Sequence, residues 1–198
     1  MKDIQRVKKF ILNAQNSRAP HETITADYLT VLAFIIRGAS TREALRVVLG
    51  NLGIQDNDKT LEQLKADGYV TVKDRRIGNT NRYECVYKYT EKALDCGFSN
   101  DSQFIYEIME IKKTFQAQSV KFMLNYLYFY LLIRERDEIT SQQAEAEYGR
   151  SMTSHDIYNV FKRLGIVNLQ LLKDKKTTAF WFKHRWIQRL NKTAGRMF

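Results

Sequence analysis

The chain has 198 residues, of which 44% are hydrophobic, and a formal net charge of +10. That hydrophobic content predicts a packed core and argues against a disordered chain. A protein with such an excess of Lys and Arg commonly binds a polyanion, because the cations neutralise phosphates and release their counterions. Charge alone does not distinguish between DNA, RNA and an acidic membrane surface.

Nothing in the sequence predicts export or insertion into a membrane. The basic start contains an apolar run of three residues, too short for a secretory signal. The longest apolar stretch, residues 122–133, contains Asn125 and falls short of the roughly 20 residues of a spanning helix, so it predicts a buried helix. Cys85 and Cys96 lack metal-ligand spacing, which favours a reduced chain. We expect a cytoplasmic, nucleoid-associated protein without a membrane partner.

Residues 1–21 are predicted to form a basic N-terminal arm with a short amphipathic helix. Residues 22–98 are predicted to form a first domain. Helix caps are expected at Thr25, at Ser40, at Asp56 or Asp58, and at Thr90. The expected elements are helices over residues 25–37, 41–50 and 59–67, strands over residues 69–73 and 82–89, and a short helix over residues 91–98.

A polar boundary at residues 99–102 precedes the second half, which opens with a helix that has no expected counterpart in the first half. Residues 99–118 are predicted to connect the two domains, and residues 119–198 to form the second, with a basic C-terminal helix. Thr140 and Gln143 form a capping-box pattern, and Thr153 or Ser154 is expected to cap a later helix. The expected elements are helices over residues 103–118, 142–149, 155–164 and 185–192, a helix that ends at residue 136, and strands over residues 166–172 and 179–184.

The two halves show a weak repeat. The Ile-Arg pairs at residues 36–37 and 133–134, near the ends of matching helices, are 97 residues apart, and so are the helix-closing residues Gly68 and Gly165. The tetrapeptides KDRR (residues 73–76) and KDKK (residues 173–176) are 100 residues apart. We predict that both lie in the basic turn of a hairpin, and that the second-half strand before the turn is three residues longer.

This order of three helices and a hairpin resembles a winged helix-turn-helix domain. Residues 25–98 are similar to the MarR-type regulators in the segments LKADGYV, KDRRIGNTNR and YTEKAL, whereas residues 119–192 are similar by order only. Two such units in one chain also resemble plasmid replication initiators and the tandem winged-helix subunits that bind kleisins in condensin-type complexes. The resemblance implies a mainly helical fold with small β-hairpins, an α+β protein of two winged-helix units.

In such a domain the third helix enters the major groove, while the hairpin, or wing, contacts phosphates or a narrow minor groove. The outward positions of the two third helices include Gln63 and Asn159, whose amides suit adenine. Basic and polar residues crowd both hairpins. The predicted DNA-binding residues are Lys59, Thr60, Gln63, Arg75, Arg76, Asn79, Asn81, Arg82, Ser154, His155, Asn159, Lys162, Lys173, Lys175, Lys176 and Thr177.

Two simpler interpretations stay open. Residues 56–67 contain four acidic residues against Lys59 and Lys65, and acids repel phosphates, so this helix could be structural while only the wing contacts DNA. The hairpin charges could serve only to keep edge strands soluble. Aromatic residues in the segment AFWFKHRW are expected in the core rather than stacked on bases.

The sequence contains no phosphate-cradling Gly-rich loop, paired metal-ligand motif or G-x-S-x-G, so we expect neither an enzyme nor a cofactor. We predict a sequence-selective double-stranded DNA-binding protein that acts in transcriptional control. Two units would contact adjacent half-sites, and a homodimer would contact more. The alternatives are a plasmid or phage replication initiator, which would use the same contacts, and a kleisin-binding type of protein-interaction subunit.

Overall fold

The computed structural model describes residues 2–16, 26–50, 58–94, 102–148, 155–174 and 176–194. It combines helices with small antiparallel sheets, as the sequence predicts. The first half contains α1 (Lys2–Asn16), α2 (Ala26–Ile36), α3 (Arg42–Gly50), α4 (Asp58–Ala66), β1 (Val70–Arg76), β2 (Tyr83–Tyr89) and α5 (Glu91–Leu94). The second half contains α6 (Ser102–Ala117), α7 (Leu124–Arg136), β3 (Glu138–Thr140), α8 (Ser141–Tyr148), α9 (His155–Arg163), β4 (Val167–Leu171), β5 (Thr178–Phe182) and α10 (His184–Ala194). The expected caps at Thr25, Asp56, Thr153 and Ser154 lie outside the described residues.

The ends of α4 and α9 have the same hydrogen-bond pattern. After α4, the amide of Gly68 donates to the Lys65 carbonyl and that of Tyr69 to the Leu64 carbonyl. After α9, the amides of Gly165 and Ile166 donate to the Lys162 and Phe161 carbonyls, 97 residues further along in each case. Both glycines have positive φ, 75° and 74°, as this helix ending requires. The predicted helix ends at these glycines are therefore confirmed.

Two predicted caps have different outcomes. The capping box before α8 is confirmed, because the Gln143 amide donates to Thr140 Oγ1 at 3.2 Å and the Thr140 amide donates to Gln143 Oε1 at 3.0 Å. The cap of α3 lies one residue later than predicted. Thr41 Oγ1, rather than Ser40, accepts a hydrogen bond from the Ala44 amide at 3.1 Å. Ser40 instead uses its carbonyl to accept from the Tyr87 amide, which ties the start of α3 to β2.

The observed sheets differ from the predicted hairpins. In the first half β1 pairs with β2, and Thr41 forms an isolated bridge with Val86; in the second half the sheet order is β3-β5-β4. Strand β3 was not predicted. Residues 73–76 lie within β1, paired with Tyr83–Val86, so KDRR is a strand rather than a turn. Residues 173–176 do lie between β4 and β5. The relative strand lengths are also the reverse of the prediction, because β1 has seven residues and β4 has five.

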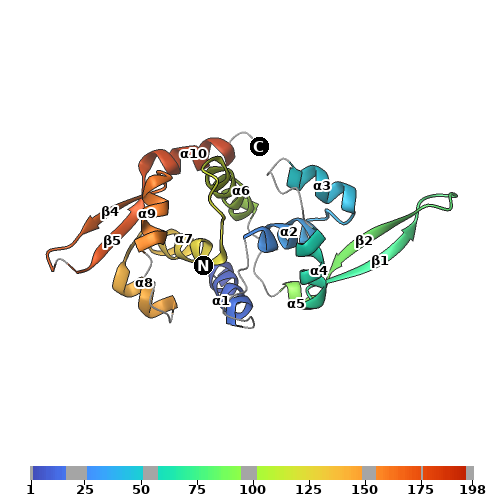
Figure 1. Cartoon of the computed structure of the whole chain (residues 1–198), viewed down its shortest axis with the longest axis horizontal. Helices are drawn as coiled ribbons and strands as arrows, with labels where there is room; N and C mark the ends of the chain where they lie inside the picture. The colour runs from blue at the N-terminus through green and yellow to red at the C-terminus, as the bar shows by residue number, and fades with distance from the viewer. Residues whose placement is uncertain are drawn as a thin grey trace.

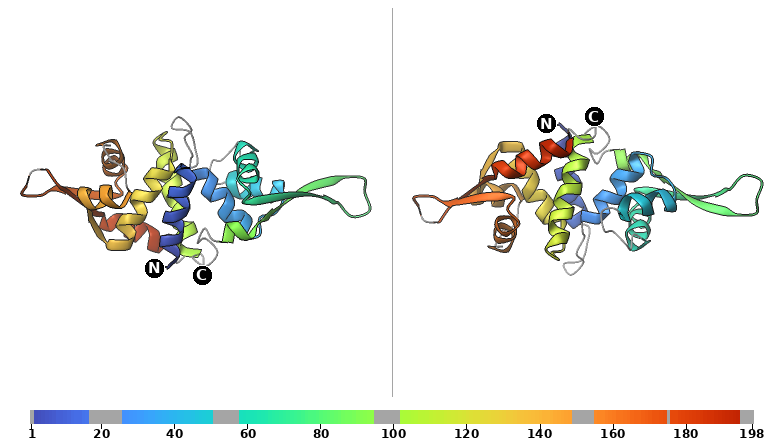
Figure 2. Two further views of the ribbon diagram at one scale, coloured as in Figure 1. Left: turned by 90° about the horizontal axis from the view of Figure 1, so that it is seen from below. Right: turned by 90° about the horizontal axis from the view of Figure 1, so that it is seen from above.

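Each half opens with a helix that packs against the other half. Helix α1 packs on α7, while α6 packs on α2 and on α10. The predicted arm is therefore a structural helix, with Val7, Phe10 and Ile11 buried. Helix α6, expected to have no counterpart, precedes α7 just as α1 precedes α2. One continuous cluster of buried residues spans both halves, and the two hairpins project from opposite ends of the long axis (Figures 1 and 2).

Helix α7 is buried on all sides, as its sequence predicts. Every residue from Tyr126 to Ile133 is buried. Inside the second half, the Tyr130 hydroxyl donates to Glu107 Oε2 at 3.2 Å and accepts from Trp186 Nε1 at 3.3 Å. Arg134 pairs with the same carboxylate at 2.9 Å. These contacts join α6, α7 and α10. Helix α7, which packs against β5 of the second hairpin, is therefore held by helices on two sides.

Candidate nucleic-acid interface

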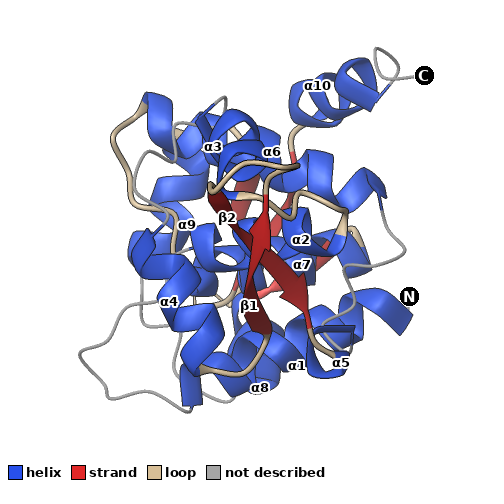
Figure 3. Ribbon diagram, turned by 90° about the vertical axis from the view of Figure 1, so that its right-hand side faces the viewer, coloured by secondary structure: helices blue, strands red, loops and turns tan. Residues whose placement is uncertain are grey.

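The first hairpin extends its basic residues away from the core. Its two strands are paired from Val70 opposite Tyr89 to Arg76 opposite Tyr83, and residues 73–83 are all exposed. Buried residues are confined to the base of the hairpin, at Val70, Val86 and Tyr87. Figure 3 looks onto this half and shows α4 beside β1, with which it is in contact. The predicted wing residues and the predicted outward residues of α4 therefore belong to one side of the molecule.

Two arginines of the first hairpin that are predicted to bind DNA, Arg75 and Arg76, have partners within the hairpin. Arg75 Nε and Nη2 both bond to Glu84 Oε1, at 2.9 and 2.6 Å. Arg76 Nε donates to the Thr80 carbonyl at 2.7 Å, and its Nη2 donates to Asn81 Oδ1 at 3.3 Å. Arg76 and Asn81 therefore shape the loop that carries Asn79. The paired carboxylate reduces the charge that Arg75 offers to a phosphate.

Two other basic side chains of this hairpin are more available. Lys73 and Arg82 are exposed, and among the described residues neither side chain has a hydrogen-bond or ion-pair partner. Arg82 follows the loop directly, whereas Lys73 lies nearer the core, opposite Val86. The positive charge of the distal part of this hairpin is therefore centred on Lys73, Arg76 and Arg82.

An aspartate organises the second hairpin. Asp174 Oδ1 accepts from the amides of Lys176 and Thr177 at 3.0 and 2.9 Å, and Asp174 Oδ2 accepts from the Thr177 hydroxyl. These hydrogen bonds, the hydroxyl bond first, lower the pKa of the Asp174 carboxyl. The Thr177 side chain is buried, so its predicted contact with DNA is not supported by its position. Lys173 and Lys176 are exposed, and Lys175 lies outside the described residues.

The third helix of the first half is α4. Leu61 and Leu64 point into the core, as predicted, while Lys59 is exposed and Thr60 and Gln63 are half-buried. Two of the acidic residues that weaken a DNA-binding interpretation of α4 have structural partners. Asp58 forms an ion pair with Arg42 of α3, and Asp67 accepts a hydrogen bond from the Tyr28 hydroxyl at 2.5 Å. Glu62 is exposed and, within the described parts of the chain, has no such partner.

The third helix of the second half is α9, and its outer face is more basic. Ile157 and Phe161 point inward, and Asn159, Lys162 and Arg163 are exposed. Tyr158 stacks on Phe180 of β5 with ring centroids 4.1 Å apart, which orients α9 against the hairpin. Burial raises the pKa of Tyr158 to about 12, and the charge of Glu145 adds to the effect. Ser154 and the side chain of His155 lie outside what the structure describes.

A cleft between α3 and the outer edge of β2 was not anticipated. It has a volume of about 600 Å³, and its lining includes Arg42, Arg46, Ile77 and Tyr83. Helix spacing could have indicated the two arginines, because they are four residues apart on a helix whose Leu45 points inward. The sequence could not have predicted that hairpin residues also line this cleft, because their position depends on the register of β1 and β2.

No protein-family model matches the chain, and the searches of curated proteins and of solved structures likewise found no match. Among the described helices, none combines the length and the apolarity that crossing a membrane requires. The described residues also contain no group of three or more His, Cys, Asp or Glu side chains placed to hold a metal ion.

Proposed function

We propose that this chain is a sequence-selective double-stranded DNA-binding protein built from two winged helix-turn-helix units, and that it acts in transcriptional control. One observation carries the proposal. In each half a helix with polar outer residues ends at a positive-φ glycine and leads directly into a hairpin whose distal residues are basic and exposed. The net charge of +10 supports a polyanionic partner.

In the proposed complex, α4 and α9 enter major grooves and the hairpins contact the flanking backbone. Asn159 would read a base edge, while Lys162, Lys173 and Lys176 would hold phosphates. In the first half, Lys59 and Arg82 would take the corresponding phosphate roles. Because the hairpins project from opposite ends of the long axis, one chain would contact two separated half-sites (Figure 1).

Selection of bound fragments from random duplex DNA, at near-physiological salt, tests this proposal. The expected result is an enriched motif with two half-sites and an affinity that falls steeply as salt rises. Binding without enrichment would contradict sequence selectivity. Weak, salt-insensitive association would instead favour the protein-interaction alternative, in which the basic hairpins have no role.

Replication initiation is the second candidate, because two winged-helix units in one chain would also resemble the plasmid replication initiators. An initiator would make the same DNA contacts, so binding does not separate it from a regulator. Deletion of the coding sequence does: loss of plasmid or phage replication would support an initiator, whereas altered transcription with replication intact would support a regulator.

A further inference from the structure

A pocket of about 420 Å³ lies between α1 and the base of the first half. Its inner wall is aromatic, because Phe10 of α1 is buried and its ring meets that of Tyr69 edge-on, with centroids 4.9 Å apart. The polar side chains that line the pocket are Arg6, Lys9, Asn13 and Lys92. Among the described residues of the lining, none is acidic. The pocket therefore gathers positive charge without a matching carboxylate.

The polar side chains that α1 contributes lie on one face of the helix. Arg6, Lys9 and Asn13 follow the spacing of three and four residues that makes side chains neighbours on a helix surface. All three are exposed, and neither cation has a hydrogen-bond or ion-pair partner among the described residues. Two unpaired cations at this spacing repel each other. An anion placed between them would therefore stabilise the folded chain.

The third cation, Lys92, is held in place by the base of the first half. Its Nζ donates to the Asp67 main-chain carbonyl at 2.8 Å and lies 4.5 Å from the centroid of the Tyr69 ring. The Asp67 carboxylate accepts a hydrogen bond from the Tyr28 hydroxyl instead. A carbonyl and a ring orient the Lys92 ammonium without neutralising it, and an ammonium has three protons to donate. Lys92 can therefore also donate to a ligand.

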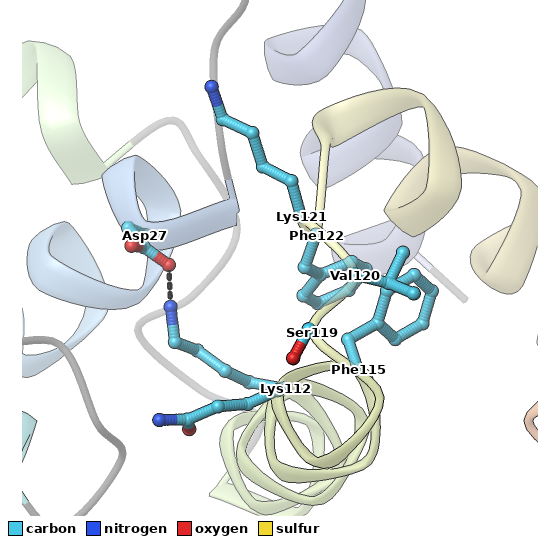
Figure 4. Close-up of a pocket in the computed structure, with 8 residues that line it drawn as sticks. Asp27, Lys112, Phe115, Ser119, Val120, Lys121 and Phe122 are labelled. Atoms are coloured by element: carbon cyan, nitrogen blue, oxygen red, sulfur yellow. Dashed lines mark hydrogen bonds and ion pairs between the residues drawn. The ribbon is translucent and has the colours of Figure 1, made fainter.

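Lysines at the contacts between the two halves are neutralised by the chain itself. Lys8, next to Lys9 on α1, is buried and pairs with Glu135 at 2.8 Å and with Glu147. Lys112 pairs with Asp27, and Figure 4 shows its ammonium directed at that carboxylate. The cations of the α1 pocket lack such a carboxylate in the described chain. An external anion would take the place that carboxylates take beside Lys8 and Lys112.

We propose that this pocket binds a phosphate group. Arg6, Lys9 and Lys92 pair with its oxygens, and the Asn13 amide donates a further hydrogen bond. Three cations favour a phosphate ester, which carries about 1.5 to 2 negative charges at pH 7, over a singly charged carboxylate. A guanidinium also matches the geometry of phosphate oxygens. The phosphate belongs either to a small phosphorylated molecule or to the backbone of a nucleic acid, because both present the same group.

The pocket is separate from the residues of the proposed DNA interface. Helices α1 and α5 lie away from the tips of both hairpins (Figure 1). The lining also contains no residue of the third helices α4 and α9. The phosphate site therefore does not depend on sequence-selective DNA binding, and a probe without DNA can test it.

Isothermal titration of the full chain with pyrophosphate at pH 7 and about 0.05 M salt tests the phosphate chemistry. We expect saturable binding, with acetate binding at least about tenfold more weakly because it carries a single charge. Absence of saturable pyrophosphate binding would overturn the site. Equal binding of acetate would overturn the assigned ligand class.

A pair of matched double variants ties the binding to this pocket. Arg6→Gln with Lys9→Gln should weaken pyrophosphate binding by about tenfold or more. Both side chains are exposed and unpartnered among the described residues, so the variant should keep the circular dichroism spectrum and Tm of the native chain. Lys113→Gln with Lys121→Gln removes the same charge from exposed positions elsewhere and should leave the affinity unchanged. Equal losses in the two variants would show a general effect of net charge and would overturn the pocket.

Duplex DNA distinguishes the two sources of the phosphate. If a backbone phosphate occupies the pocket, Arg6→Gln with Lys9→Gln should weaken binding to any duplex, and should reduce the salt slope by up to about 1.8. If the ligand is a small phosphorylated molecule, the same variant should lose pyrophosphate binding and keep its affinity for duplex DNA. Either result supports the phosphate site. Failure of the chain to bind DNA would contradict the proposed function alone, since the pyrophosphate titration is measured without DNA.

Discussion

The hairpin of the first half and that of the second half both carry basic residues, but those residues have different partners. In the first half Arg75 pairs with Glu84, and Arg76 bonds to the loop. In the second half the only acid of the hairpin turn, Asp174, is bonded to the turn itself. Lys173 and Lys176 therefore remain exposed without an ion-pair partner in the described chain.

The third helices of the two halves, α4 and α9, also differ in charge, and that of the second half is again the more basic. Helix α4 presents Asp58 and Glu62 beside Lys59, whereas the exposed face of α9 presents Asn159, Lys162 and Arg163. A count of basic residues is thus a poor guide to the charge that a phosphate would meet, because nearby carboxylates consume part of it. If the chain binds DNA as proposed, the second half should supply most of the sequence-independent affinity.

The largest expected effect is on affinity. Replacing Lys162, Lys173 and Lys176 with Ala should weaken binding to any duplex on the order of 100-fold near 0.15 M salt, and should reduce the salt slope by about 2.7, if each lysine holds one phosphate. Fluorescence anisotropy titrations over a salt series measure both quantities. The first-half variant, Arg75→Ala with Arg76→Ala, removes two charges instead of three and should lose less than about tenfold. Equal losses would show that internal pairing does not distinguish the two hairpins.

The next effect concerns base recognition. Asn159→Ala should remove about 1–3 kcal/mol of discrimination at one base pair, because an exposed amide on α9 can bond to a base edge. Gln63→Ala should change the preference less, since Gln63 is half-buried on α4. Fragment selection with each variant compares the two enriched motifs. A larger change for Gln63→Ala would reverse the assigned importance of the two helices.

A third prediction tests whether the halves are equivalent in fold despite their different charges. Gly68→Ala and Gly165→Ala should each lower the free energy of unfolding by about 1–2 kcal/mol, and by similar amounts. An added Cβ meets no atom within 4 Å at either glycine, so the cost is that of the left-handed backbone alone. Urea denaturation measures it. Gly50→Ala, on α3 and without positive φ, is the control and should not destabilise.

The smallest expected effect comes from a substitution that frees a paired arginine of the first hairpin and so makes its exposed charge more like that of the second. Glu84→Gln leaves Arg75 unpaired, so affinity for duplex DNA should rise about fivefold near 0.15 M salt. The dependence of affinity on salt should steepen by the amount expected for one additional phosphate contact. Glu91→Gln removes an exposed acid of α5 and controls for the change in net charge. If both variants gained equally, the pairing of Arg75 with Glu84 would not be what limits the first hairpin.

Local features of the fold could be predicted from the sequence because they depend on neighbours along the chain. The glycine-closed ends of α4 and α9 and the Thr140–Gln143 capping box involve residues within a few positions of one another. The burial of α7 follows from its composition, since apolar side chains cover all of its faces. The candidate lysines of the second hairpin were predictable for the same reason, as they flank a short turn.

The contacts decided by the tertiary structure join residues that are distant in the chain. The extension of β1 through KDRR depends on its register with β2, and the pairing of Arg75 with Glu84 follows from that register. The packing of α1 on α7 and of α6 on α2 depends on how the halves bury their apolar faces together. The sequence by itself therefore determined the order of the helices and those helix ends that neighbouring residues close, through local hydrogen bonding and periodicity. Only the tertiary structure decided which charges remain exposed and which faces of the two halves pack together, because both depend on non-local packing.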